Sequence, residues 1–188
     1  MSEGTQHHRR VVTGHTAQGR STVVSDGSVS RAFDFEAVPG MSNELVWATD
    51  GRGRSIEIGK DAEGLSYVPE PAGTRLMIVR FPPDDVFASP DFDPQAASIE
   101  QSELLPGLAE LFEPDAPGFH RTPTVDYGIV LEGEITLHLD DAAAVTLKAG
   151  DMIVQNATRH AWRNPTPRPA TVVFVLVGAP DPDPATQA

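Results

Sequence analysis

The most constraining feature of this 188-residue chain is a dense series of short apolar segments in its C-terminal half. Tight connections, such as Glu132-Gly133 and the stretch Asp140–Ala143, separate neighbouring segments. We expect a strand in each of the following segments: Val125–Leu131, Glu134–Leu139, Val145–Leu147, Met152–Gln155, His160–Arg163 and Thr171–Val177. Many short strands at this spacing are typical of an antiparallel sandwich or barrel, so the sequence predicts an all-β fold.

The rest of the chain contains an arm, a further strand and an insertion. The arm consists of short apolar pieces between Gly, Ser and Asp, which predicts strands that complete the sheets. Thr74–Phe81 is apolar on both faces and is predicted to be a buried strand. Residues 84–118 are expected to form an irregular insertion with one helix at Glu103–Phe112. The predicted organisation is a flexible N-terminus (1–10), an N-terminal strand arm (11–70), the main domain (71–178) and a disordered tail (179–188).

Charge and composition exclude several classes of partner. The formal net charge is −13, so the surface repels phosphate backbones and anionic lipid headgroups, and we expect neither nucleic acid nor a membrane as partner. The longest apolar run, Val172–Val177, is far too short to span a bilayer. Cysteine is absent, which excludes a disulfide framework and a thiolate metal site. The polar start Met1–Arg10 does not resemble a signal peptide, and we expect a cytoplasmic protein.

Strand alternation places candidate chemical groups on common faces. If the chain stays extended through Pro123, the even-numbered residues of the segment 120–130 lie on one face, where an imidazole accompanies the Asp126 carboxylate. His160 and Trp162 share a face for the same reason. Imidazole and carboxylate are donors that divalent transition metals accept, so a metal site is a candidate here.

Two stretches resemble the paired motifs of the cupin family. The stretch 120–133 resembles the first motif, in which a glycine follows an acidic residue by seven positions, as Gly133 follows Asp126. The stretch 150–164 resembles the second motif, and its residues 160–164 match the His-x-x-x-Asn ending. The resemblance implies a double-stranded β-helix, or jelly roll, in which the N-terminal strands form an arm and one or two short helices complete the fold.

The resemblance also implies a metal site. It assigns the ligands to His120, Asp126 and His160, a donor set that suits Fe, Mn, Ni, Co or Zn without choosing among them. Thr122 stands where the family has a second histidine, and it either leaves a coordination position open or simply packs in the wall of the pocket. The catalytic candidates are Asp126 and Tyr127, and the candidates for substrate contact are Thr122, Gln155, Trp162 and Arg80.

Several functions are compatible with such a site. The leading interpretation is a metal-dependent enzyme acting on a small organic substrate, with aromatic and polyketide-like molecules as candidates. Oxygenase, decarboxylase, isomerase and cyclase reactions all occur on similar cupins, and fold analogy does not choose among them. The alternative is a non-catalytic cupin that binds or senses a small molecule through a degenerate metal site; a storage role is weaker, because the chain lacks a duplicated domain. Similar cupins commonly pair through their sheets, often with an exchanged N-terminal strand, so the resemblance also implies a homodimer.

Overall fold

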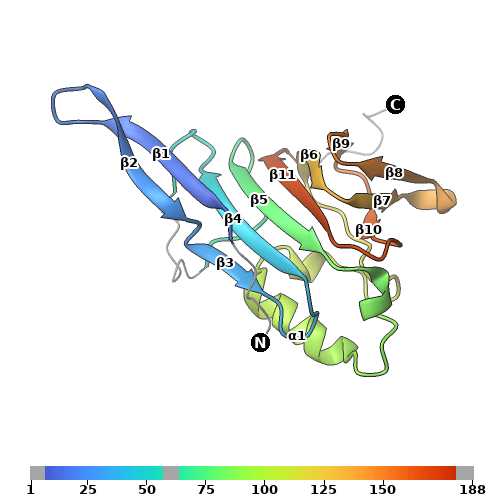
Figure 1. Cartoon of the computed structure of the whole chain (residues 1–188). Coiled ribbons are helices and arrows are strands. Elements are labelled where there is room, and N and C mark those ends of the chain that lie inside the picture. The colour runs from blue at the N-terminus through green and yellow to red at the C-terminus, as the bar shows by residue number, and fades with distance from the viewer. Residues whose placement is uncertain (1–6, 57–63, 181–188) are drawn as a thin grey trace, which may run out of the picture.

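Figure 1 shows the fold in a computed structural model that describes residues 7–56 and 64–180. The strands are β1 (Arg9–His15), β2 (Ser21–Ser28), β3 (Arg31–Asp34), β4 (Ser42–Thr49), β5 (Thr74–Phe81), β6 (Thr124–Glu132), β7 (Glu134–His138), β8 (Ala144–Lys148), β9 (Met152–Asn156), β10 (Ala161–Arg163) and β11 (Ala170–Gly178). The helical elements are α1 (Pro94–Leu104) and the 3₁₀ turns η1 (Asp84–Val86), η2 (Ala109–Leu111) and η3 (Asp140–Ala142). The predicted all-β fold is confirmed. Within the described ranges, no helix is long and apolar enough to cross a bilayer.

The strands form a large sheet, a small sheet and a hairpin. The large sheet has the order β3-β4-β5-β11-β6-β9, the small sheet has the order β10-β7-β8, and neighbouring strands run antiparallel in both. The hairpin is formed by β1 and β2. In Figure 1 the small sheet lies beside β6, β9 and β11, at one end of the large sheet, while the hairpin projects from the other end. This arrangement agrees with the predicted jelly roll with an N-terminal arm.

The central strand β11 shows why the two sheets pack together. Its residues alternate between buried and half-buried positions, and Phe174 and Leu176 belong to the buried set. Ile135 and Leu147, from the small sheet, join the same hydrophobic cluster. Removal of apolar surface from water contributes about 25 cal/mol per Å², so this shared core stabilises the contact between the sheets.

The helix of the insertion lies earlier than predicted, and the expectation of a helix at Glu103–Phe112 is wrong. The observed helix α1 begins after Asp93, whose side chain accepts hydrogen bonds from two N–H groups of the first turn, and Pro94 occupies the first helical position. It ends just before Pro106 and Gly107, and Gly107 has a φ of 81°. The leucine spacing indicated a helix there, but the local cap and the glycine set its limits.

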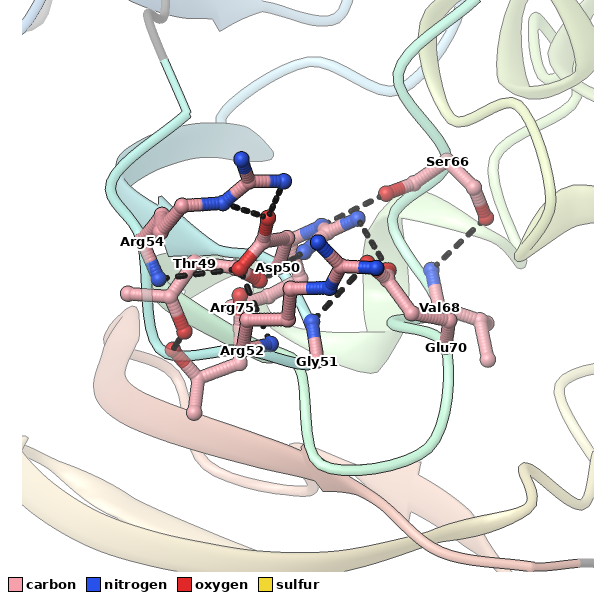
Figure 2. A network of polar contacts seen from close by, with 10 residues as sticks. Thr49, Asp50, Gly51, Arg52, Arg54, Ser66, Val68, Glu70 and Arg75 are labelled. Carbon is pink, nitrogen blue, oxygen red and sulfur yellow. Dashed lines mark hydrogen bonds and ion pairs between the residues drawn. The ribbon is translucent and has the colours of Figure 1, made fainter.

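A buried arginine ties the segment before β5 to the sheet. Arg75 is only 2% exposed, and its Nε donates to the carbonyl oxygen of Ser66 at 2.7 Å. Its Nη1 donates to the carbonyl oxygens of Thr49 at 3.2 Å and Thr74 at 2.8 Å. Figure 2 shows this network, in which the Glu70 carboxylate lies 3.7 Å from Nη2 of Arg75. A buried guanidinium is tolerated because these acceptors replace its hydration.

The N-terminal segment contacts the large sheet before β1 begins. The His8 N–H donates to Oε2 of Glu44 at 3.0 Å, and Nδ1 of His8 lies 2.7 Å from Oε1. Glu44 is buried in β4, and a buried carboxylate needs such partners. These contacts tie the start of the described chain to the large sheet, while the flexibility expected for residues 1–10 stays a prediction. Residues 1–6 and 181–188, which belong to the ends predicted to be flexible, lie outside the described residues.

Apolar side chains are exposed on the hairpin and on one face of the large sheet. They are Val11, Val23 and Val24 in the hairpin, and Tyr127, Leu131, Met152 and Val154 on β6 and β9. An isolated two-stranded hairpin is marginally stable in water, and exposed apolar patches are typical of interfaces. These features agree with the homodimer implied by the sequence, which stays a prediction.

We expect the full chain to show twice its monomer mass of 20.1 kDa in light scattering at micromolar concentration. The double substitution Val23→Ser, Val24→Ser removes apolar contacts of the hairpin and is expected to weaken dimerisation by at least about tenfold. Ile99→Ser, at an equally exposed position of α1, is the matched control and should leave the dimer intact. A monomeric full chain would contradict the prediction.

Candidate functional site

Two histidines from the two motifs meet in the structure. His120 precedes β6 and His160 precedes β10, and together they form an isolated antiparallel bridge. The backbone N–H of each residue donates to the carbonyl oxygen of the other at 2.9 Å. Both side chains are buried, and the centroids of their rings lie 4.3 Å apart. The fold thus brings two imidazoles that are distant in the sequence into one site.

Hydrogen bonds to the backbone orient both rings. Nδ1 of His120 lies 3.1 Å from the carbonyl oxygen of Gly118, and Nδ1 of His160 lies 2.9 Å from that of Thr158. A carbonyl oxygen can only accept, so each Nδ1 carries the proton and each Nε2 presents its lone pair. Burial lowers the pKa of His120; burial, reinforced by the charge of His120, lowers the pKa of His160 to about 4. Both imidazoles are therefore neutral at pH 7, the form that binds metals.

Aromatic side chains surround the two imidazoles. The Phe112 ring lies 4.6 Å from that of His120, and the Trp162 ring lies 6.2 Å from that of His160. Trp162 also lies 5.5 Å from Phe174 of the core. The structure therefore places Trp162, a predicted substrate contact, beside the histidine pair. Phe112 was missed, because only the folded insertion brings it to His120.

Asp126 lies on the buried face of β6, as strand alternation predicted. Asp126 is only 6% exposed, and this burial raises the pKa of its carboxyl group to about 6. A hydrogen bond with Thr124 lowers the pKa, but its effect is smaller than that of burial. Gln155, a predicted substrate contact, is the partner of Asp126 in the register of β6 and β9 and is buried as well. Thr122 is buried, and its Oγ1 lies 2.7 Å from Oγ1 of Thr124. This contact agrees with the interpretation that Thr122 packs in the wall of the site.

Tyr127 and Arg80 lie away from this group. Tyr127 alternates with the buried Asp126 and is 47% exposed, so it faces the outside of the large sheet. Arg80 on β5 alternates with the buried Val79 and therefore also faces outward. Their proposed roles in catalysis and substrate contact find no support in these positions, because a strand residue on the opposite face cannot reach the same pocket.

Sequence reasoning also missed an arginine that holds the insertion against the histidine loop. Arg159 directly precedes His160, and its Nε and Nη2 donate to the two carboxylate oxygens of Glu113. Its Nη1 donates to Asp140 at 2.9 Å, and its guanidinium lies 4.1 Å from the centre of the Phe119 ring. Planar bidentate pairs of this kind impose geometry, so Arg159 positions the loop that carries His160. No local motif signals this role.

The donor set fits a metal at the histidine pair. Two neutral, adjacent imidazoles with oriented Nε2 atoms suit a divalent transition ion. In residues 7–56 and 64–180, however, no three His, Asp or Glu side chains are grouped as the ligands of one ion. Asp126 as a third ligand therefore stays a prediction, and His120 and His160 are the residues that could hold such an ion.

Comparison with known proteins identifies the family. A family model described as the Cupin domain matches residues 110–176, which include both histidines and Asp126. The phomopsin biosynthesis cluster protein C′ of Diaporthe leptostromiformis is 56% identical over 159 residues, covering 82% of this chain and 69% of that protein. The chain belongs to the cupin superfamily. The motif resemblance of the sequence is therefore confirmed.

Two further relatives extend the comparison. The cupin is 48% identical to the oryzines biosynthesis cluster protein J of Aspergillus oryzae over 50 residues, which is 27% of this chain and 28% of that protein. It is 25% identical over 198 residues to the cupin-domain-containing oxidoreductase fogC of Aspergillus ruber, with 96% of this chain and 81% of that protein covered. The match to the oryzines protein thus spans well under two thirds of that relative.

Proposed function

We propose that this cupin is a metal-dependent enzyme that transforms a small organic metabolite by oxidoreductase chemistry. The observation that carries the proposal is the pair of buried imidazoles, whose rings lie 4.3 Å apart and whose Nδ1 atoms are engaged by backbone carbonyls, so that each Nε2 presents its lone pair. Enzymes orient metal-binding histidines in this way. A catalytic ion leaves coordination positions free for substrate, and two protein ligands leave more of them than three.

Each residue of the site has a distinct part in this proposal. His120 and His160 would hold the ion, which when bound would polarise and orient a substrate oxygen. In this proposal Asp126 is not a ligand of the ion: its Oδ1 is buried without a hydrogen-bond partner in the described part of the chain and is available to accept a proton or a hydrogen bond from the substrate. Phe112 and Trp162 exclude water from the imidazoles and provide apolar contact. Arg159 keeps the loop of His160 in place.

The names of relatives support the substrate class and the type of reaction. Two of them are named as proteins of biosynthesis clusters, and a third is named as a cupin-domain-containing oxidoreductase. A cupin related to them is consistent with an enzyme of a biosynthetic route. This favours oxidoreductase chemistry over the decarboxylase, isomerase and cyclase reactions that the fold also accommodates.

Metal analysis of protein purified without chelator tests the proposal. We expect roughly one divalent transition ion per chain, because two imidazoles and open positions suit such an ion. The double substitution His120→Ala, His160→Ala should lower the metal content at least about tenfold. His138→Ala, on β7 and outside the pair, is the control and should keep it. Equal metal content in the wild type and the double variant would overturn the assignment.

The alternative is a non-catalytic cupin that binds or senses a small molecule. The observation that favours it is that the described residues contain no group of three metal-binding side chains. Such a protein would bind its ligand without metal and would not turn it over. A metal-free wild type that still binds a small molecule would select this function.

A further inference from the structure

A cross-strand pair on the buried face of β6 and β9 has unused hydrogen-bonding capacity. Asp126 on β6 and Gln155 on β9 are direct partners in the antiparallel register, so their side chains emerge side by side on the same face. Both residues are almost fully buried, at 6% and 3% exposed. Within the described residues, Oδ1 of Asp126 and Nε2 of Gln155 have no hydrogen-bond partner.

Two adjacent unpaired groups call for a partner from outside the protein. A buried polar atom that lacks a hydrogen bond costs about 1–3 kcal/mol, and buried side-chain polar atoms are seldom left unpaired. The flanking position on β11 is occupied by Leu176, which offers no polar group to Asp126. A water or a ligand group that reaches both atoms would supply the missing partners.

The two atoms differ in character, and this difference selects a ligand group. Oδ1 of Asp126 accepts a hydrogen bond, whereas Nε2 of Gln155 donates one. A matching group presents an N–H and an acceptor oxygen side by side, pointing the same way. Primary carboxamides and lactams have such an edge. A carboxylate would set its negative charge against that of Asp126, and a ketone has no N–H to donate.

We propose that Asp126 and Gln155 form a subsite that binds a primary carboxamide or lactam edge of the substrate. The ligand N–H donates to Oδ1 of Asp126, and the ligand carbonyl oxygen accepts from Nε2 of Gln155. This inference rests on the proposed function and names a substrate class for the same site. Benzamide is a suitable probe, because it carries this edge on an aromatic ring and because Phe174 is the register partner of Gly128, the next inward residue of β6, with the Trp162 ring 5.5 Å from that of Phe174.

The test compares benzamide, sodium benzoate and acetophenone on the full chain as purified, by calorimetry and by ¹⁵N NMR of the Gln155 side-chain amide. That resonance is assigned by its loss in Gln155→Leu. We expect benzamide to bind and to shift the Gln155 resonance, with benzoate and acetophenone at least about tenfold weaker. Gln155→Leu should weaken benzamide binding at least about tenfold and keep or raise the melting temperature, because it removes an unpaired buried group. Gln95→Leu, the same change at an exposed position of α1, should alter neither.

The possible outcomes separate this inference from the proposed enzyme. The subsite would be refuted if benzamide failed to bind, if acetophenone bound equally well, or if Gln155→Leu lowered the melting temperature and so revealed a structural water. Metal content is measured on the same samples. Gln155→Leu should retain the metal of the wild type. A wild type that discriminates among the three probes but carries no metal would sink the metal-dependent function while leaving the subsite in place.

Discussion

Replacing Arg75 with alanine is expected to lower the free energy of unfolding by about 3 kcal/mol. The side chain is 2% exposed and donates to the carbonyl oxygens of Ser66, Thr49 and Thr74. Truncation leaves these acceptors with fewer donors and opens a void among them, and both effects destabilise a buried site. Urea unfolding followed by circular dichroism measures the change.

Arg54→Ala provides the matched control in the same region. Arg54 pairs with Asp50, as Figure 2 shows, but its side chain is 70% exposed. Exposed ion pairs contribute little, so we expect a loss below about 1 kcal/mol. Equal losses in the free energy of unfolding for the two substitutions would contradict the argument that the contacts of Arg75 stabilise the fold more strongly because they are buried.

The strands of the C-terminal half could be predicted because each of them has a local sequence pattern that indicates a strand or a turn. β11 contains the continuous apolar run Val172–Val177, which predicts a buried strand, and the glycine of the first motif lies where the chain must turn. Gly133 has a φ of 77°, and a Cβ there would lie 2.6 Å from the carbonyl oxygen of Pro169. Both the sequence pattern and the structure therefore require glycine at this position. The helix of the insertion was predicted in the wrong place because its start is determined by the cap Asp93 and not by the spacing of apolar residues.

The site was only partly predictable, for a related reason. The motif resemblance located His120, His160 and Asp126, which share the buried side of the fold. Tyr127 adjoins Asp126 in the sequence, but strand alternation puts it on the opposite face. Arg159 could not be found, because its partners come from the insertion and from the turn after β7. Such long-range contacts leave no local pattern in the sequence.

The second large effect concerns the pH dependence of stability, which Asp126→Asn should change. Burial raises the pKa of Asp126 to about 6, above its ordinary value of 3.8. Between roughly pH 4 and pH 6 the folded chain therefore keeps a proton that the unfolded chain has lost. Stability falls as the pH rises through this window, by about 3 kcal/mol in total. Because asparagine is neutral at every pH, the Asp126→Asn variant does not lose this stability as the pH rises.

Protonation of His160 changes the stability of the fold in the opposite direction over nearly the same pH range. Its pKa is lowered to about 4 from 6.5, so the unfolded chain binds its proton first and stability is lost as the pH falls. The two effects partly cancel in the wild type, and Asp126→Asn removes only one of them. The free energy of unfolding of Asp126→Asn minus that of the wild type should therefore increase by about 3 kcal/mol between pH 4 and pH 7.

Denaturant unfolding at several pH values, with chelator present so that no metal titrates, measures this difference. Asp115→Asn, at an exposed position of the insertion, controls for the loss of one negative charge. A difference between Asp126→Asn and the wild type that stayed constant from pH 4 to pH 7 would show that the Asp126 carboxyl is solvated in the folded chain. The hydrogen bonds that Asp126 makes in solution would then be to water that enters the fold, and its burial beside Gln155 would no longer distinguish it from a surface carboxylate.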